Sequence, residues 1–245
     1  MADCCFGAIL DALRGLGLVE ANGRRPETDL AELARQRVAD DALAAKREAQ
    51  ALACWREASP IAGSLAETYL RARGIACDLP AALRFHPACW HPSERRFPAL
   101  VAMVEGGARF AMHRTYLRPD GGGKAEAEPA KAMLGAVAGG AVRIAEAAGG
   151  LVVAEGIETA LSLASGLLGR PATIWAALST SGMIGLVLPP TPGRLTIATD
   201  GDAPSRTAGH ALATRATGLG WRVSLLPAPE GRDWNDVLAR KGDAA

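Results

Sequence analysis

Two stretches decide the fold: Leu-Val-Val-Ala-Glu-Gly-Ile-Glu-Thr-Ala at residues 151–160 and Arg-Leu-Thr-Ile-Ala-Thr-Asp-Gly-Asp at residues 194–202. Each contains a short apolar run that is followed directly by acidic residues. Runs this short and this rich in Val, Ile and Leu are too brief for a buried helix, and they predict buried strands at Leu151–Ala154 and Leu195–Thr199.

The residues between these two strands predict a parallel sheet. A helical pattern covers Glu158–Leu168, a third apolar run covers Thr173–Leu178, and a second helical pattern covers Met183–Leu188. Strands that alternate with helices indicate parallel strands joined by helical crossovers. In such sheets ligands bind beyond the carboxyl ends of the strands.

Acidic residues follow two of the predicted strands at this end. Glu155 follows the first strand, and Asp200 and Asp202 follow the third, with Gly201 allowing the chain to turn between them. If the two strands are neighbours, three carboxylates meet at one edge of the sheet. Oxygen ligands in this position suit Mg²⁺, which keeps several waters and often binds substrate phosphates. The alternative is that these acids serve only as helix-start and turn residues.

The pair of motifs resembles the Toprim domain, which is shared by bacterial-type primases, topoisomerases and some nucleases. The string Glu-Gly-Ile-Glu-Thr-Ala-Leu-Ser, together with Asp-Trp-Asn-Asp at residues 233–236, is similar to the Toprim of phage- and plasmid-type primases, and the resemblance covers residues 50–240. It implies that Glu155 serves in acid/base chemistry and that Asp200 and Asp202 bind Mg²⁺ or Mn²⁺. Asp233 would join these ligands, although a helix N-cap is an equal alternative for it.

Composition sets bounds on the class of protein. The chain has 49% apolar and 22% charged residues, an ordinary globular composition, and a net charge of +1, so a nucleic-acid site must come from local clustering. No apolar run approaches the ~20 residues needed to cross a bilayer, so no membrane association is expected. Five cysteines without a Cys-x-x-Cys pair predict reduced thiols and a cytoplasmic protein.

Residues 1–49 are expected to form an N-terminal helical segment, with a brief helix at Phe6–Leu18 and one long helix or two over Thr28–Ala58. In the primases that the chain resembles, a zinc-binding module precedes the catalytic part. Cys4 or Cys5 resembles the last ligand of such a module, so the segment is either its remnant or a plain capping helix. A structural zinc needs four ligands, so zinc is not expected in this chain.

Residues 50–149 are expected to form a small basic α+β subdomain. A helix at Leu65–Arg73 is closed by Gly74, and β patterns cover Ala99–Val104 and Arg109–Leu117. Residues 71–124 carry nine Lys/Arg against four Asp/Glu among several aromatic residues, a pattern that suits single-stranded nucleic acid. A solvated domain with an aromatic core is the alternative, and the resemblance favours the first. The candidate DNA- or nucleotide-binding residues are Arg84, Arg114, Lys124 and Lys131.

The sequence therefore predicts an α/β protein. A Toprim-like, Rossmann-like parallel sheet of about four strands, with helices on both faces, is expected at residues 150–245. The resemblance implies a DNA primase-like nucleotidyltransferase that makes short RNA primers on a single-stranded DNA template from ribonucleoside triphosphates, with unwinding supplied by a separate replicative helicase. The alternatives are a Toprim-type metal-dependent nuclease and a non-catalytic DNA-binding module of a replication complex. A topoisomerase needs a tyrosine nucleophile on a gate domain, and the chain has no room for one.

Overall fold

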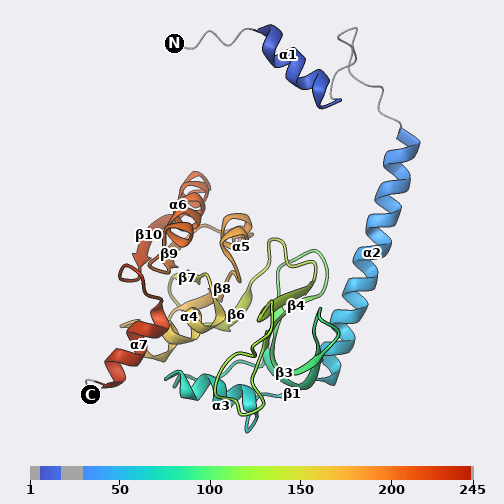
Figure 1. Ribbon diagram of the computed structural model, residues 1–245. Helices are drawn as coiled ribbons and strands as arrows, with labels where there is room; N and C mark the ends of the chain where they lie inside the picture. The colour runs from blue at the N-terminus through green and yellow to red at the C-terminus, as the bar shows by residue number, and fades with distance from the viewer. Residues whose placement is uncertain (1–5, 18–29, 244–245) are drawn as a thin grey trace. The chain divides into compact units, whose positions relative to one another are not determined.

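The structure is a computed structural model that describes residues 6–17 and 30–243 (Figure 1). The chain divides into two compact units, residues 1–43 and residues 44–245. Helix α1 (Phe6–Gly15) and the beginning of α2 (Leu30–Glu57) belong to the first unit. The two predicted helical regions are thus confirmed, and the second is one continuous helix. Cys4 and Cys5 lie outside the described residues.

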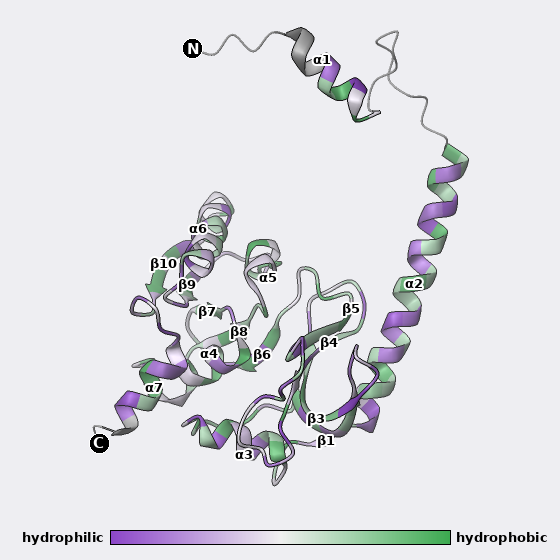
Figure 2. Cartoon of the chain, in the orientation of Figure 1, coloured by the Kyte–Doolittle hydropathy of each residue, from purple (hydrophilic) through white to green (hydrophobic). Residues whose placement is uncertain are grey.

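Helix α2 has mixed polar and apolar residues along its length, as its alternating colours in Figure 2 show. No helix within residues 6–17 and 30–243 combines the length and the apolar character that crossing a bilayer would require. The described cysteines, Cys54, Cys77 and Cys89, are free thiols.

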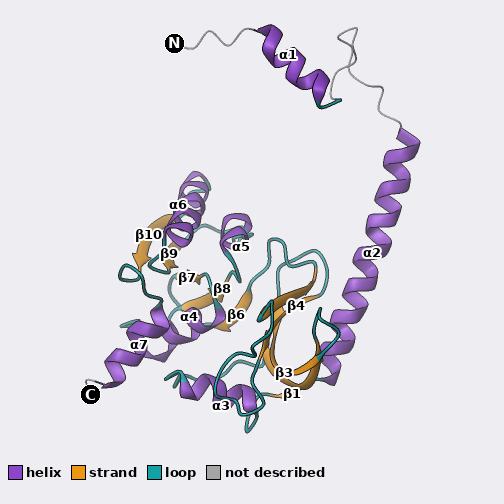
Figure 3. Cartoon of the chain, viewed as in Figure 1, coloured by secondary structure: helices purple, strands orange, loops and turns teal. Residues whose placement is uncertain are grey.

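The second unit contains an antiparallel sheet whose strands follow one another in chain order. Strands are drawn in orange in Figure 3. The strands of this sheet are β1 (Ser59–Pro60), β2 (Leu83–Trp90), β3 (Arg96–Val104), β4 (Ala111–Tyr116) and β5 (Lys131–Gly135). The two β patterns predicted at Ala99–Val104 and Arg109–Leu117 are confirmed as strands, and they form a hairpin in which Val104 of β3 pairs with Ala111 of β4. Helix α3 (Leu65–Ala72) lies between β1 and β2; Ser64 caps its start, and Gly74 follows it with φ +77°.

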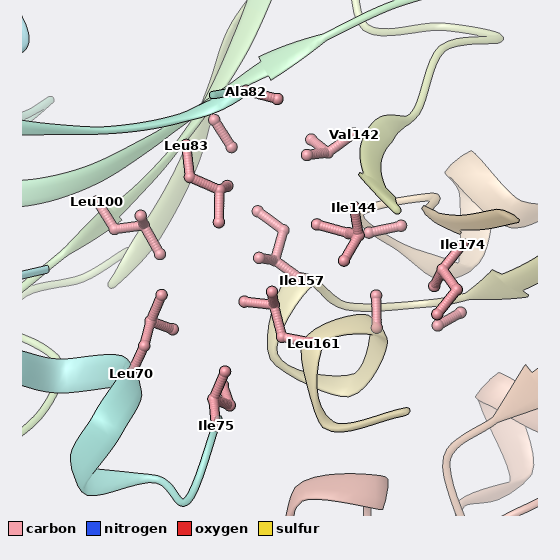
Figure 4. Packing of buried hydrophobic residues seen from close by; sticks show 14 of the residues in the cluster. Leu70, Ile75, Ala82, Leu83, Leu100, Val142, Ile144, Ile157, Leu161 and Ile174 are labelled. Carbon is pink, nitrogen blue, oxygen red and sulfur yellow. The ribbon is translucent and has the colours of Figure 1, made fainter. Parts of the chain in front are cut away.

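The two faces of this first sheet are covered differently because side chains alternate along each strand. Ala99, Val101 and Met112 point to the face that also contains Ala51 of α2, and we call this the outer face. Leu83 and Leu100 point to the opposite, inner face and share a core with α3 and the second sheet. Figure 4 shows these two leucines gathered with Leu70, Ile157 and other apolar residues in one space.

The second sheet has the strand order β10-β9-β7-β8-β6. Its strands are β6 (Val142–Ala145), β7 (Leu151–Ala154), β8 (Thr173–Ala176), β9 (Arg194–Thr199) and β10 (Arg222–Pro227). The last four are parallel to one another, which confirms the predicted parallel sheet. The sequence did not predict β6, which joins the edge in antiparallel orientation although it precedes residue 150.

Helices cover both faces of the second sheet, as expected. Residues of α4 (Ile157–Ser162) and α7 (Trp234–Asp243) pack in the core that the two sheets share. Residues of α5 (Thr180–Gly185) and α6 (Ala203–Gly218) pack in a separate core on the other face. The second sheet is therefore buried on both sides, which explains why β7 is apolar throughout.

Two predicted helix boundaries were wrong, each for a local reason. Helix α5 begins at Thr180 and not at Met183, because the Ser179 hydroxyl accepts a hydrogen bond from the Gly182 N–H at 2.9 Å and caps the helix there. The helix predicted at Glu158–Leu168 leaves α-helical geometry after Ser162. It continues as a π-helical turn over Leu163–Leu167, in which Gly166 has φ +101°.

Candidate active site

The site is built on the two central strands of the second sheet. Strands β7 and β9 are hydrogen-bonded parallel neighbours, with Ala154 opposite Ala198. Glu155 directly follows β7, and Asp200 directly follows β9. Parallel neighbours end at the same edge, so the predicted adjacency of these two acids is confirmed.

Asp200 is the centre of negative charge at this edge. Burial, and then the neighbouring Glu155, raise the pKa of Asp200 to about 6, and Asp233 and Asp202 push it the same way. The Thr159 hydroxyl opposes this by donating to Asp200 Oδ1 at 3.2 Å. The other three acids that the sequence singled out therefore all act on Asp200, and Asp200 is the point that connects them.

Asp202 and Asp233 also begin helices. Asp202 Oδ1 accepts from the Ser205 N–H at 2.8 Å at the start of α6, and Asp233 Oδ1 accepts from the Asp236 N–H at 2.8 Å at the start of α7. Asp233 is therefore a helix N-cap, which was the alternative to a metal ligand in the sequence analysis. Each cap uses Oδ1, so capping fixes the carboxylate at the sheet edge and is compatible with a second role for Oδ2.

The chain bends at Gly201, as predicted, and this glycine has a second role that the sequence did not predict. Its N–H donates to the Arg232 carbonyl at 2.7 Å, and its own carbonyl accepts from the Gly231 N–H at 3.1 Å. A Cβ at residue 201 would collide with the carbonyl oxygen of Pro229. Glycine is needed here for close approach of two main chains, and this approach holds the loop that leads to Asp233 against the acidic edge.

The acids fit a hard divalent cation. Glu155 Oε2 is buried and has no hydrogen-bond partner, and the charged groups that contribute most to the raised pKa of Asp200 are carboxylates. Within the described residues no group of three or more His, Cys, Asp or Glu side chains is already arranged to hold an ion. A donor set of carboxylates on separate elements suits Mg²⁺ or Mn²⁺ that keeps much of its water shell.

Two of the predicted basic residues lie on the outer face of the first sheet. Arg84 of β2 and Arg114 of β4 flank Val101 in the same cross-strand row. The guanidinium of Arg84 lies 4.3 Å from the ring centroid of Trp55. Arg114 is 3% exposed and donates to the carbonyls of Trp90 and Met133 at 3.0 and 3.3 Å, so it bonds to the interior of the subdomain.

The other two basic residues lie on the inner face, beside the second sheet. Lys131 Nζ donates to Glu158 Oε2 at 2.9 Å, and Lys124 Nζ lies 3.5 Å from Glu158 Oε1. The lysine side chains are 37% and 36% exposed. The structure therefore divides the predicted set of four between two faces of one sheet.

Two residues of this site were missed by sequence reasoning. Glu158 and Thr159 stand in the first turn of α4, and every residue of that helix is buried. The sequence did contain a signal for Glu158, which is an acidic residue in a helix of mostly apolar residues. A carboxylate that is buried with such a helix requires charged or hydrogen-bonding partners, so it could have been recognised as part of a site.

Two family models match separate parts of the chain. The Toprim domain family matches residues 150–244, and a domain of unknown function (DUF7146) matches residues 45–144. No curated protein matches the chain.

Three solved structures are similar to the chain. A DNA primase domain from Pseudomonas aeruginosa has 18% identity and a TM-score of 0.45, over 74% of this chain and 68% of that one. The Aquifex aeolicus primase (zinc binding and RNA polymerase domains) has 14% identity and a TM-score of 0.39, over 60% and 38%. The RNA polymerase domain of Mycobacterium tuberculosis primase DnaG has 17% identity and a TM-score of 0.37, over 89% and 75%.

Proposed function

Because residues 150–244 form a Toprim domain, we propose that this chain is a DNA primase-like nucleotidyltransferase that makes short RNA primers on single-stranded DNA. One observation carries the proposal: Glu155, Asp200, Asp202 and Asp233 converge at one sheet edge, next to a helix whose Glu158 holds two lysines. Acids that can hold a divalent cation, together with cations for phosphates, are what nucleotidyl transfer requires.

Glu155 is the proposed general base. In the reaction the 3′-oxygen of the growing primer forms a bond to the α-phosphorus of the incoming ribonucleoside triphosphate. The bond from that phosphorus to the leaving pyrophosphate breaks, and the 3′-hydroxyl proton must be removed. Glu155 Oε2 has no partner to compete for that proton, and a positioned carboxylate is suited to accept it.

The three aspartates are the proposed ligands of Mg²⁺ or Mn²⁺. When bound, the cation offsets the negative charge that develops on the phosphates. With a pKa of about 6, Asp200 is mostly ionised at neutral pH. Thr159 orients the Asp200 carboxylate, while the Ser205 hydroxyl accepts from the Asp200 main-chain N–H at 3.0 Å and ties the strand end to α6.

We place the template contact at Arg84 and Trp55. A guanidinium stacked on an indole presents both a charge for a phosphate and a face for a base, as single-stranded DNA requires. The proposed partners are the template, ribonucleoside triphosphates and a separate replicative helicase.

The test is incubation of the protein with single-stranded DNA, labelled ribonucleotides and Mg²⁺. New labelled oligonucleotides are expected, and an Asp200→Asn/Asp202→Asn variant should make none. Shortened DNA would refute the proposal in favour of a Toprim-type nuclease, which would use the same acids with water. Bound but unchanged DNA would refute it in favour of a non-catalytic module of a replication complex.

A further inference from the structure

The carboxylate of Glu158, in the Toprim domain, contacts side chains of the subdomain that precedes this domain. Glu158 is 5% exposed and lies in the first turn of α4. The Tyr69 hydroxyl of α3 donates to its Oε1 at 3.0 Å, Lys131 of β5 donates to its Oε2 at 2.9 Å, and Lys124 lies 3.5 Å from Oε1. Each of these partners comes from the residues that precede the Toprim domain.

The cluster around Glu158 carries a net positive charge. Burial opposes ionisation of Glu158, but Lys131 and Lys124 outweigh it and hold its pKa well below the ordinary range. Burial, and then Glu158, raise the pKa of Tyr69, so its hydroxyl stays a neutral donor. Burial, and then Lys131, lower the pKa of His113 to about 4, so that imidazole is neutral at physiological pH. Two ammonium groups and one carboxylate remain.

The cluster adjoins the acidic edge. A Cβ built on Gly156, the residue after Glu155, would lie 3.8 Å from Glu158 Oε2. Thr159, the residue after Glu158, donates to Asp200. One turn of helix thus directs Thr159 to the acids and Glu158 to the lysines, so the two ammonium groups are fixed beside the proposed reaction site.

The lysines keep donors for a ligand. An ammonium has three N–H groups, and the hydrogen bond from Lys131 to Glu158 uses one of them. Both side chains remain more than a third exposed. Within the part of the chain that the structure describes, Glu158 is the one side chain that forms an ion pair with either lysine.

We propose that Glu158 is a positioning residue, which holds Lys124 and Lys131 so that their remaining N–H groups bind the triphosphate of the incoming ribonucleotide. The inference rests on the proposed function and assigns a residue to substrate binding within it. Glu158 itself does not touch the substrate, since its oxygens are taken by the lysines and Tyr69.

Glu158→Gln is the decisive substitution because it keeps the size of the side chain and removes its charge. Without the carboxylate the two ammonium groups repel each other, and one is displaced or loses its proton. The charged and titratable groups around the cluster are Tyr69, Arg73, His113, Lys124, Lys131 and Asp233, and Arg114 acts on His113 from the other face of the sheet. Among these, Lys124 has a pKa that burial lowers and that Glu158 opposes, so the loss of Glu158 should lower the pKa of Lys124 further.

The experiment measures kcat and the nucleotide KM of primer synthesis, together with ATP binding by calorimetry without template, from pH 7 to pH 9. We expect Glu158→Gln to raise KM and weaken ATP binding by about tenfold, the size of one lost charged partner, with kcat nearly kept. The loss should grow as the pH rises in the variant and not in the wild type. If Glu158 had only a structural role, its substitution would not change how ATP affinity depends on pH between pH 7 and pH 9.

Controls separate positioning from folding. Glu48→Gln changes a partly buried glutamate of α2 that is paired with Arg109 at 3.1 Å, and it should leave KM unchanged. In a Lys124→Met/Lys131→Met background, Glu158→Gln should add no further loss. If Glu158→Gln does not fold, the Lys124→Met and Lys131→Met single variants test the inference instead. Each of them must raise the nucleotide KM.

Three results would overturn the inference: wild-type KM and ATP affinity in folded Glu158→Gln, unchanged KM in both lysine variants, or no ATP binding by the wild type. If the wild type binds ATP but makes no primers, the proposed function fails, while the ATP titrations still decide the role of Glu158.

Discussion

Asp200→Asn is expected to stabilise the metal-free protein at pH 8 and to leave its stability nearly unchanged at pH 4. Burial and Glu155 raise the pKa of Asp200 from 3.8 to about 6. The folded state therefore binds this proton more tightly than the unfolded state does. The free energy of unfolding consequently falls as the pH rises from about 4 to about 6. Above that range the wild type holds a carboxylate charge that Asn lacks.

The size of the gain follows from the pKa. A shift of about two units corresponds to at most ~3 kcal/mol, because one unit is ~1.4 kcal/mol. Asp200 is only partly buried, so solvent screening reduces this by roughly half. Asn can still accept the hydrogen bond from Thr159, and the bond to Ser205 comes from the main chain. We therefore expect about 1–2 kcal/mol, or ~3–6 °C in Tm.

The assay is thermal unfolding of both proteins in EDTA at pH 4, 6 and 8. Asp120→Asn is the matched control, since the Gly122 N–H and Arg118 hold the pKa of Asp120 below its ordinary value and no gain at pH 8 is expected. Added Mg²⁺ should then stabilise the wild type more than Asp200→Asn. A variant that gains nothing at pH 8, or gains equally at pH 4, would refute carboxylate repulsion at this edge.

Three further predictions concern the acids, the glycine between them and the divided basic residues. Glu155→Gln should abolish primer synthesis but keep the stabilisation by Mg²⁺, as seen in primer assays and melts with and without the cation. Gly201→Ala should lower the free energy of unfolding by ~1–3 kcal/mol in urea titrations, because its Cβ collides with Pro229 and displaces the loop before Asp233. Arg114→Met should cost ~1–3 kcal/mol of stability and leave DNA affinity unchanged, since its bonds go to buried carbonyls. Arg84→Ala should keep the fold and flatten the salt dependence of single-stranded DNA binding by ~0.7, and the opposite assignment of effects to these two arginines would contradict the divided arrangement.

The acidic edge could be predicted from the sequence because its information is local. Each acid directly follows a short apolar run, and the strand, helix, strand pattern brings such runs into one parallel sheet. The glycine between the aspartates was predicted to allow a turn, which the structure has, but its second role could not be predicted. Its close approach to Pro229 depends on a loop that is distant in sequence, and composition around Gly201 carries no sign of that loop.

The basic residues could not be placed from the sequence because their positions depend on cross-strand register. Arg114 pairs with Ala132, so Lys131 pairs with Thr115 and points to the opposite face of the sheet. A shift of one residue in that pairing would reverse the two faces. Counting charges along the chain places Arg114 and Lys131 in one set. The register instead directs Arg114 to the interior beneath α2 and Lys131 to Glu158.

The apolar core that the two sheets share explains how Lys124 and Lys131 of the first subdomain can lie beside the acids of the second sheet. Leu83 and Leu100 of the first sheet pack in one continuous cluster with Val152 of β7 and Ile157 of α4. Close-packed interiors resist relative movement, so the distance between the lysines and the acids is fixed by apolar contacts and not by the ion pair alone. Glu158 then has no need to hold the two sheets together. Its burial carries a desolvation cost, and a carboxylate retained at that cost, in the turn that also orients Asp200 through Thr159, is better explained by positioning two charges than by stabilising the fold.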